Sequence, residues 1–186
     1  NDIPGVMLAS AVREYVVNYA VSPGDRTVVV TNNDDAYRTA LALKAAGLSV
    51  PVSVEARSGG EDGPLVAAAE AQGIRVLQGH GIAKVKGGKR VTGVAICAQA
   101  GEGAVLEEIA CDAVAMSGGW SPVVHLWSHC GGKLTWNDHY AMFQPDPDQP
   151  TINQYGIGFV HAAGVAAGPA EAQGLSLSHT LASATE

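Results

Sequence analysis

This sequence of 186 residues lacks several features that define other classes of protein. It contains no run of about 18 consecutive apolar residues, which a membrane-spanning helix needs. Its first residues do not join a positively charged segment to an apolar one, as secretory signal peptides do. We therefore expect neither a membrane span nor a signal peptide.

Cysteine is scarce, and the three residues present are Cys97, Cys111 and Cys130. An odd number without a C-x-x-C spacing does not suit the disulfide framework of an exported domain. No activating partner for a cysteine nucleophile is evident in the sequence. Reduced thiols are expected, and they favour a cytoplasmic location.

Positive charge is also scarce, because 11 basic residues stand against 18 acidic ones and give a net charge of −7. Nucleic-acid binding needs a basic face that neutralises phosphate groups. The sequence therefore predicts no nucleic-acid partner.

Glycine is missing from one turn whose surroundings call for it. Residues 28–47 read VVVTNNDDAYRTALALKAAG, which predicts a buried strand, a polar turn and an amphipathic helix that stops at Gly47. The first βα unit of a dinucleotide-binding fold has this pattern, with a G-x-G-x-x-G turn that holds the pyrophosphate. Asn32, Asp34 and Tyr37 occupy the three glycine positions.

Each of these three replacements has its own consequence. Asparagine tolerates the left-handed backbone conformation, so Asn32 can still form a tight turn. Asp34 is predicted to cap the helix over 35–46 and would place a carboxylate where the diphosphate should lie. Tyr37 puts a ring where helix and strand should approach closely. The turn is therefore predicted to bind a dinucleotide poorly.

Glu55, in contrast, is a feature that favours dinucleotide binding. It ends the next expected strand, about 20 residues after the turn, where dinucleotide folds place the acid that binds a ribose. The alternative interpretation is a strand-end carboxylate paired with Arg57.

The rest of the first half alternates helices with strands. Apolar residues at helical spacing predict the helices, and short apolar runs predict the strands. Helices are expected over residues 6–20, 35–46 and 63–73, and strands over 27–30, 48–56 and 74–79. This order predicts a parallel sheet with right-handed crossovers.

The pattern changes after the third strand. Residues 82–112 predict three strands joined by glycine turns, which is a β-meander. The remaining expectations are a strand over 113–119, a helix over 121–132, a loop over 143–156, a strand followed by a small-residue turn over 157–168, and a final helix. The order predicts an α/β, Rossmann-like three-layer domain of the FAD/NAD(P)-binding type, with a parallel sheet and a β-meander crossover. A plain doubly wound sheet with an inserted hairpin is the alternative.

Several stretches together resemble the alpha subunit of heterotetrameric sarcosine oxidase. They are NDIPGVMLASAVREYV at the N-terminus, VVVTNNDDAYRTALAL at the glycine-free turn and CDAVAMSGGWSPVVHLWSHCGGKLTW from Cys111. The resemblance covers nearly the whole sequence. Its motifs are specific as a set, because TNND and SGGW depart from ordinary reductases in the same way.

The resemblance implies an oxidoreductase subunit. The complete complex of that family oxidises sarcosine to glycine and yields hydrogen peroxide and a one-carbon unit that folate accepts. It implies NAD in the alpha subunit, FAD and FMN in the complex, and the other subunits of the heterotetramer as partners. The family's NAD lies in a first dinucleotide fold, whose glycine motif this sequence lacks.

The resemblance also makes this sequence a fragment, as its start without Met suggests. Residues 1–25 are expected to be an N-terminal helix and linker from the missing first domain. Residues 26–142 are expected to form a Rossmann-like inserted domain, and 143–186 a returning loop, strand and helix of the first domain. Such a fragment is not expected to be catalytic alone.

The candidate cofactor-binding residues also come from the resemblance. In flavin reductases, the strand that leaves the inserted domain ends in a small-residue turn against the first-domain cofactor. Ser117, Gly118 and Gly119 occupy that place, and Gly164 stands at the end of the returning strand. Val165 replaces the Asp that meets a flavin there, which favours NAD. Alternatively, the glycines serve only as turns and the domain is a scaffold for subunit contacts.

Two other patterns are weaker. His125 and His129 have zinc-ligand spacing, but no third ligand is evident, so no metal is expected. Ser117 follows a strand as a hydrolase nucleophile would, with His161 as the base, but a helix does not start directly after it. No catalytic residue is therefore assigned.

Overall fold

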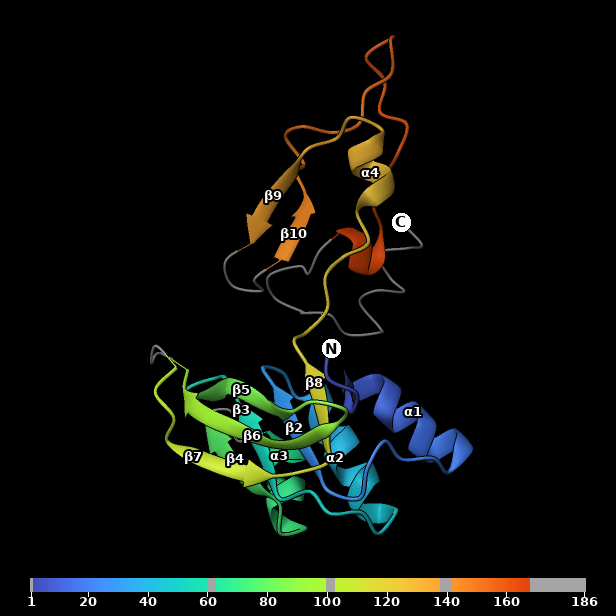
Figure 1. Ribbon diagram of the computed structural model, residues 1–186. Coiled ribbons are helices and arrows are strands. Elements are labelled where there is room, and N and C mark those ends of the chain that lie inside the picture. The colour runs from blue at the N-terminus through green and yellow to red at the C-terminus, as the bar shows by residue number, and fades with distance from the viewer. Residues whose placement is uncertain (1, 60–62, 100–102, 138–141, 168–186) are drawn as a thin grey trace. The chain divides into compact units, whose positions relative to one another are not determined.

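The computed structural model describes residues 2–59, 63–99, 103–137 and 142–167. It consists of two units, Asn1–Gly119 and Trp120–Glu186, each of which is described by itself (Figure 1).

The first unit is built on a parallel sheet of five strands. Their order is β1 (Val6–Leu8), β8 (Ala113–Ser117), β2 (Thr27–Thr31), β3 (Val52–Glu55) and β4 (Arg75–Gln78). The chain therefore runs outward from β2 to β4 and returns through β8 on the other side of β2. This reversal between β2 and β8 is the topological switch point, outside which open α/β sheets bind their ligands.

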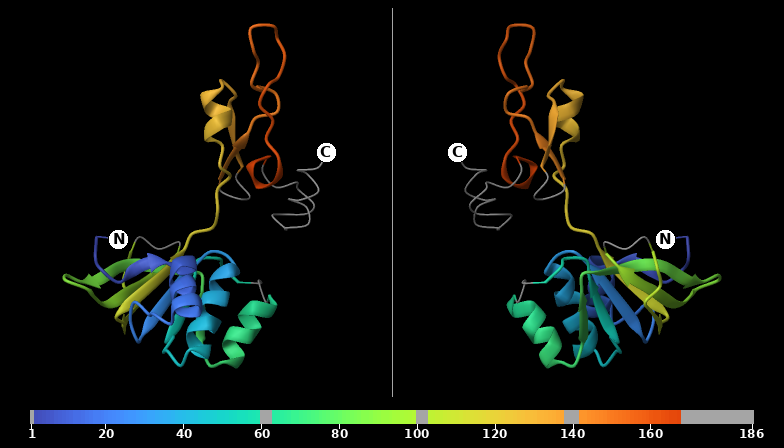
Figure 2. Two further views of the ribbon diagram at one scale, coloured as in Figure 1. Left: turned by 90° about the vertical axis from the view of Figure 1, so that its right-hand side faces the viewer. Right: turned by 90° about the vertical axis from the view of Figure 1, so that its left-hand side faces the viewer.

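Helices cover one face of this sheet, and an antiparallel β-meander covers the other (Figure 2). The helices are α1 (Ala9–Tyr19), α2 (Asp35–Ala45) and α3 (Pro64–Ala71), and the meander strands are β5 (His80–Gly87), β6 (Val91–Ala98) and β7 (Glu107–Ala110). Neighbouring strand residues face opposite layers, so that Val29 packs against the helices and Val28 against the meander. The predicted three-layer α/β fold is thus confirmed.

The helix that follows the glycine-free turn ends as predicted. Gly47 adopts the left-handed conformation, with φ +79°, directly after the C-cap residue Ala46. The amide of Leu48 then donates to the carbonyl of Leu43, which satisfies one of the last free carbonyls of α2.

The first unit departs from expectation at its start. The helix expected over 6–20 begins only at Ala9, because Val6–Leu8 pair in parallel with Val114–Met116 of β8. A sheet edge offers unpaired backbone groups, and this pairing overrides the helical spacing of the apolar residues. The expected divisions after residues 25 and 142 concern a longer protein and stay predictions. Within this chain, β1 and α1 belong to the first unit, which ends at Gly119.

The second unit contains less regular structure. Its elements are α4 (His125–His129), a hairpin of β9 (Leu134–Asn137) and β10 (Met142–Pro145), and the short 3-10 helix η1 (Gly164–Ala167). The helix expected over 121–132 is thus shorter than predicted, and the hairpin was not predicted. Trp127 is buried and donates from its ring nitrogen to the Lys133 carbonyl at 2.7 Å, which holds the turn between α4 and β9.

The strand predicted at the start of 157–168, before a small-residue turn, is wrong for the described residues. Residues 157–163 form no strand, and Gly158 makes only an isolated bridge with Ile152. A strand needs a partner, and here the Thr151 hydroxyl bonds both backbone groups of Val160 at 3.0 Å. The final helix that was predicted lies outside the described residues. No helix in the described part of the chain combines the length and apolar character of a membrane span.

Candidate functional site

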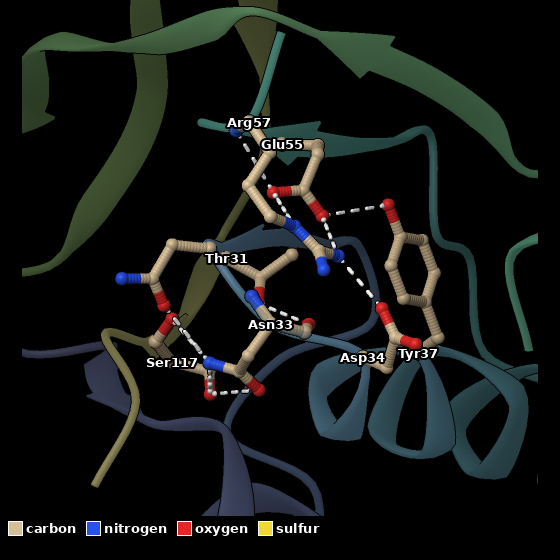
Figure 3. A network of polar contacts seen from close by, with 8 residues as sticks. Thr31, Asn33, Asp34, Tyr37, Glu55, Arg57 and Ser117 are labelled. Carbon is tan, nitrogen blue, oxygen red and sulfur yellow. Dashed lines mark hydrogen bonds and ion pairs between the residues drawn. The ribbon is translucent and has the colours of Figure 1, made fainter. Parts of the chain in front are cut away.

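The candidate site lies at the carboxyl ends of three neighbouring strands. Thr31 at the end of β2 is in register with Glu55 at the end of β3 and with Ser117 at the end of β8. The turn between β2 and α2 therefore faces both neighbouring strand ends (Figure 3). Two sets of polar contacts fill this region, one on each side of the turn.

The first set is centred on Arg57 (Figure 3). Its Nη2 donates to Asp34 Oδ1 at 2.7 Å and to Glu55 Oε2 at 2.8 Å, and its Nε donates to Glu55 Oε1 at 3.0 Å. The backbone amide of Arg57 also donates to Glu55 Oε1 at 3.0 Å. Glu55 is only 2% exposed, and this forked guanidinium contact compensates its buried charge.

Tyr37 completes this network from the first turns of α2. The side chain is fully buried, and its hydroxyl donates to Glu55 Oε2 at 3.2 Å. Burial raises the pKa of Tyr37, and the neighbouring Glu55 charge raises it further, so the phenol stays a donor. The hydrogen bond to Glu55 likewise raises the pKa of Arg57, with a smaller contribution from Asp34.

Asp34 lies at the predicted N-cap position of α2, but the predicted capping bond is absent. Asp34 has helical backbone angles, φ −74° and ψ −23°, and its side chain makes no capping hydrogen bond. Its carboxylate contacts Arg57 instead, and Asp34 lacks the extended backbone angles that a capping residue needs. The turn before the helix is held by Thr31, whose hydroxyl donates to the Asn33 carbonyl at 2.7 Å and accepts from the Asn33 amide at 3.0 Å.

The Arg57 network decides between the two interpretations of Glu55. Both oxygens of the Glu55 carboxylate accept hydrogen bonds from Arg57, and one also accepts from Tyr37. A ribose hydroxyl would have to displace these donors. The structure therefore supports the strand-end carboxylate paired with Arg57. It also places a guanidinium between the start of α2 and the end of β3, where a dinucleotide would lie in the fold.

The second set of contacts joins the turn to β8. Asn33 Nδ2 donates to Ser117 Oγ at 2.9 Å, and Ser117 Oγ donates back to Asn33 Oδ1 at 3.2 Å. Asn32 Nδ2 donates to the Gly118 carbonyl at 3.2 Å. The ends of β2 and β8 are thus cross-linked by side chains at the switch point.

The predicted cofactor-binding residues fall in both units. Ser117 and Gly118 make the contacts just described, and Gly119 follows in the left-handed conformation with φ +90°. Gly164 lies in the second unit, where it begins η1 instead of ending a strand. The Ser117 hydroxyl is bonded to an amide and not to a base, which gives it no nucleophilic activation. Among the described residues, no group of three or more His, Cys, Asp or Glu side chains could hold a metal ion.

Sequence reasoning missed two functions of single residues. Asn33 was not singled out, although a short amide next to a strand end can bond a neighbouring strand. Arg57 was considered only as a partner of Glu55, and its second contact to Asp34 depends on a residue 23 positions earlier in the chain.

Three curated proteins named sarcosine oxidase subunit alpha are similar to this chain. The one from Rhizobium meliloti (strain 1021) is 37% identical over 144 residues, which cover 77% of this chain and 14% of that protein. The one from Corynebacterium sp. (strain P-1) is 40% identical over 154 residues, which cover 78% of this chain and 15% of that protein. The chain therefore spans about a seventh of the length of these relatives. No family model matches it.

Solved structures confirm the fold. Thioredoxin reductase from T. acidophilum matches with a TM-score of 0.65 and 20% identity, over 93% of this chain and 53% of that one. Thioredoxin reductase from Lactococcus lactis matches with a TM-score of 0.62 and 17% identity, over 96% of this chain and 54% of that one. At these identities the likeness shows the FAD/NAD(P)-binding type of fold alone. The sequence matches carry the closer relation: over the matched residues, this chain is a relative of one segment of the sarcosine oxidase alpha subunits.

Proposed function

We propose that this chain is part of the alpha subunit of a sarcosine-oxidising complex and supplies a structural domain beside a bound NAD, not a catalytic centre. The complete complex would demethylate sarcosine to glycine, with hydrogen peroxide and a one-carbon unit for folate as the other products. FAD and FMN would lie elsewhere in that complex, and the other subunits would be the partners. The names of the sequence relatives support the reaction.

One observation carries the structural role: Arg57 bridges Asp34 and Glu55 across the chain's own dinucleotide-type crevice. A nucleotide that entered there would have to separate the buried Glu55 from its partner, which costs about 3–5 kcal/mol for a buried ion pair. Each 1.4 kcal/mol changes an equilibrium constant tenfold, so this cost would lower a micromolar affinity about a thousandfold. The Asp34 carboxylate would in addition repel the diphosphate.

NAD is therefore proposed to bind in the longer protein, outside this crevice, with Ser117, Gly118 and Gly119 at its edge and Gly164 on the returning segment. The space around Gly118 supports a close approach. Apart from its two chain neighbours, no atom of the described residues lies within 4 Å of a Cβ atom added there. A glycine pair at a strand end lets a ligand approach the backbone.

Calorimetric titration of NAD⁺ tests the closed crevice. The purified chain is expected to show no binding, and Asp34→Gly alone is expected to show none, because Arg57 stays bonded to Glu55. The assembled oxidase is the positive control, with NAD bound and sarcosine-dependent peroxide formation. Micromolar binding by the unaltered chain would show that the glycine-free turn accepts a diphosphate and would contradict the proposal.

A scaffold without any nucleotide contact is the second candidate. It is favoured by the Ser117 hydroxyl and the Gly118 carbonyl, which already have partners inside the first unit. Gly118→Val in the assembled oxidase separates the two candidates, with Gly88→Val as the matched control at another uncrowded glycine. A weaker NAD affinity for Gly118→Val alone would support a nucleotide at the exit from β8. Equal NAD affinities in the Gly118→Val and Gly88→Val variants would favour a scaffold that makes no contact with the nucleotide.

A further inference from the structure

We infer that Asn32 and Asn33 are positioning residues that hold the segment Ser117–Gly119, termed here the exit segment, in the conformation that meets NAD. The inference rests on the proposed function, in which the exit segment borders the nucleotide. The turn that binds the pyrophosphate in dinucleotide folds would thus act here on a neighbouring strand end.

Asn33 uses its amide in both directions (Figure 3). The Nδ2 group donates to Ser117 Oγ at 2.9 Å and to the Ser117 carbonyl at 3.3 Å, and Oδ1 accepts from the Ser117 hydroxyl at 3.2 Å. The Thr31 hydroxyl fixes the Asn33 backbone on the opposite side. Asn33 is therefore a pre-oriented group that bonds both the side chain and the backbone of the last β8 residue.

Asn32 extends these contacts one residue further. Its backbone amide donates to the Ser117 carbonyl at 3.3 Å, and its Nδ2 donates to the Gly118 carbonyl at 3.2 Å. Asn33 Nδ2 also lies 3.0 Å from Asn32 Oδ1, so the two amides support each other. A Cβ atom on Gly119 would lie 3.7 Å from Asn32 Oδ1, which is ordinary contact distance. Two consecutive asparagines thus adjoin all three residues of the exit segment.

The chemistry of the contacts requires amides. The carbonyls of Ser117 and Gly118 accept only from donors, and a carboxylate of the same size offers none. A Gly-Gly pair without such contacts has wide conformational freedom, which a ligand at the exit segment would have to restrict on binding. Holding the segment in advance would remove that cost and tighten NAD binding without any contact between NAD and the asparagines.

Asn33→Asp is the sharpest test, because it keeps the size and the acceptor oxygens and removes the donor. Two measurements are made: hydrogen exchange of the Asn32 amide, which donates to the Ser117 carbonyl, in the purified chain, and NAD dissociation from the assembled oxidase. We expect exchange to become about three- to tenfold faster and the dissociation constant for NAD to rise by a similar factor, the range for one net hydrogen bond. Asn18→Asp on the exposed face of α1 is the matched control and should change neither.

Three results would decide the matter. Unchanged exchange in Asn33→Asp would show that the amide does not hold the exit segment. Faster exchange with an unchanged NAD affinity would show that the contacts are only structural, and it would overturn the inference. A wild-type oxidase that holds no NAD would refute the proposed function, without any variant. If Asn33→Asp fails to fold, Asn32→Asp, at an exposed position, removes the donor to Gly118 and serves the same test.

Discussion

At the scale of single residues, Arg57 has the largest predicted effect on stability. Its side chain is 28% exposed and that of Glu55 only 3%, whereas Asp34 is 43% exposed. Solvent weakens the contact to Asp34, so the guanidinium stabilises the fold mainly by compensating the buried charge of Glu55.

Arg57→Met is therefore expected to lower the free energy of unfolding by about 3–5 kcal/mol, because Glu55 would stay buried without its cation. Urea denaturation of the purified chain measures the change. Asp34→Asn is the control and should cost less than about 1 kcal/mol. Arg57→Met combined with Glu55→Gln should regain part of the loss. If the double variant is as unstable as the single one, the unpaired charge is not the cause.

Two buried groups predict a loss of stability at alkaline pH. Burial raises the pKa of Cys111 from 9.0 to about 11, and the pKa of Tyr37 is raised above its ordinary 10.0. Between about pH 9 and 11 the unfolded chain releases the Cys111 proton and the folded chain keeps it, so the free energy of unfolding falls with pH. Below pH 9, neither Cys111 nor Tyr37 lowers the free energy of unfolding, because both stay protonated in the folded and in the unfolded chain.

Urea midpoints measured from pH 7 to 11 check this expectation. Cys111→Ala should flatten the decline between pH 9 and 11, and the remaining slope above pH 10 should come from Tyr37. A decline that Cys111→Ala leaves unaltered would assign the effect to other groups.

The candidate site shows where sequence reasoning stops at this scale. The sequence predicted a pairing of Glu55 with Arg57, because the two residues lie only two positions apart and their charges are opposite. It could not predict the direction of the Asp34 side chain, since its partner Arg57 comes from the loop after β3, 23 positions later in the chain. Local capping rules compare only neighbours along the chain, and here the side chain makes a tertiary contact instead.

At the scale of elements, prediction succeeded where one periodicity was sustained. Thr27–Thr31 and Asp35–Ala45 match expectation because apolar runs and a helical stripe are local signals. Val6–Leu8 and residues 157–163 do not, because a strand exists only where a partner does. The first segment pairs with β8 and becomes a strand. The second bonds Thr151 and Asn153 at single points and forms no ladder.

The starts of β2 and β8 are joined by another tertiary contact. The Asp112 carboxylate accepts from the backbone amides of Asp25 at 3.1 Å and Arg26 at 2.8 Å. A Cβ atom on Gly24 would overlap Asp112 Oδ1. Gly24→Ala should therefore lower the free energy of unfolding by about 1–3 kcal/mol, the usual cost of overpacking. Gly88→Ala, with no atom within 4 Å of the added carbon, should stay within about 0.5 kcal/mol. Equal thermal midpoints for the two variants would refute the steric account.

At the scale of the whole molecule, the hydrophobic core is concentrated in the first unit. Both clusters of buried apolar residues, with the side chains packed against them, lie within residues 3–115. A protein of residues 1–119 is therefore expected to unfold cooperatively by itself, at a midpoint within a few degrees of that of the chain's main transition. Differential scanning calorimetry of both proteins checks this. Non-cooperative melting of the shorter protein would show that its core depends on residues beyond Gly119.

The Arg57 bridge also has an evolutionary consequence. Replacing Asp34 with glycine leaves the guanidinium bonded to Glu55, and replacing Arg57 leaves a buried carboxylate with no cation. Neither substitution alone yields a stable chain with an open crevice, so selection for nucleotide binding would find no gain at the first step. The ion pairs thus make the loss of nucleotide binding hard to reverse. A lineage that carries Asp34, Glu55 and Arg57 regains a nucleotide site only through coordinated changes.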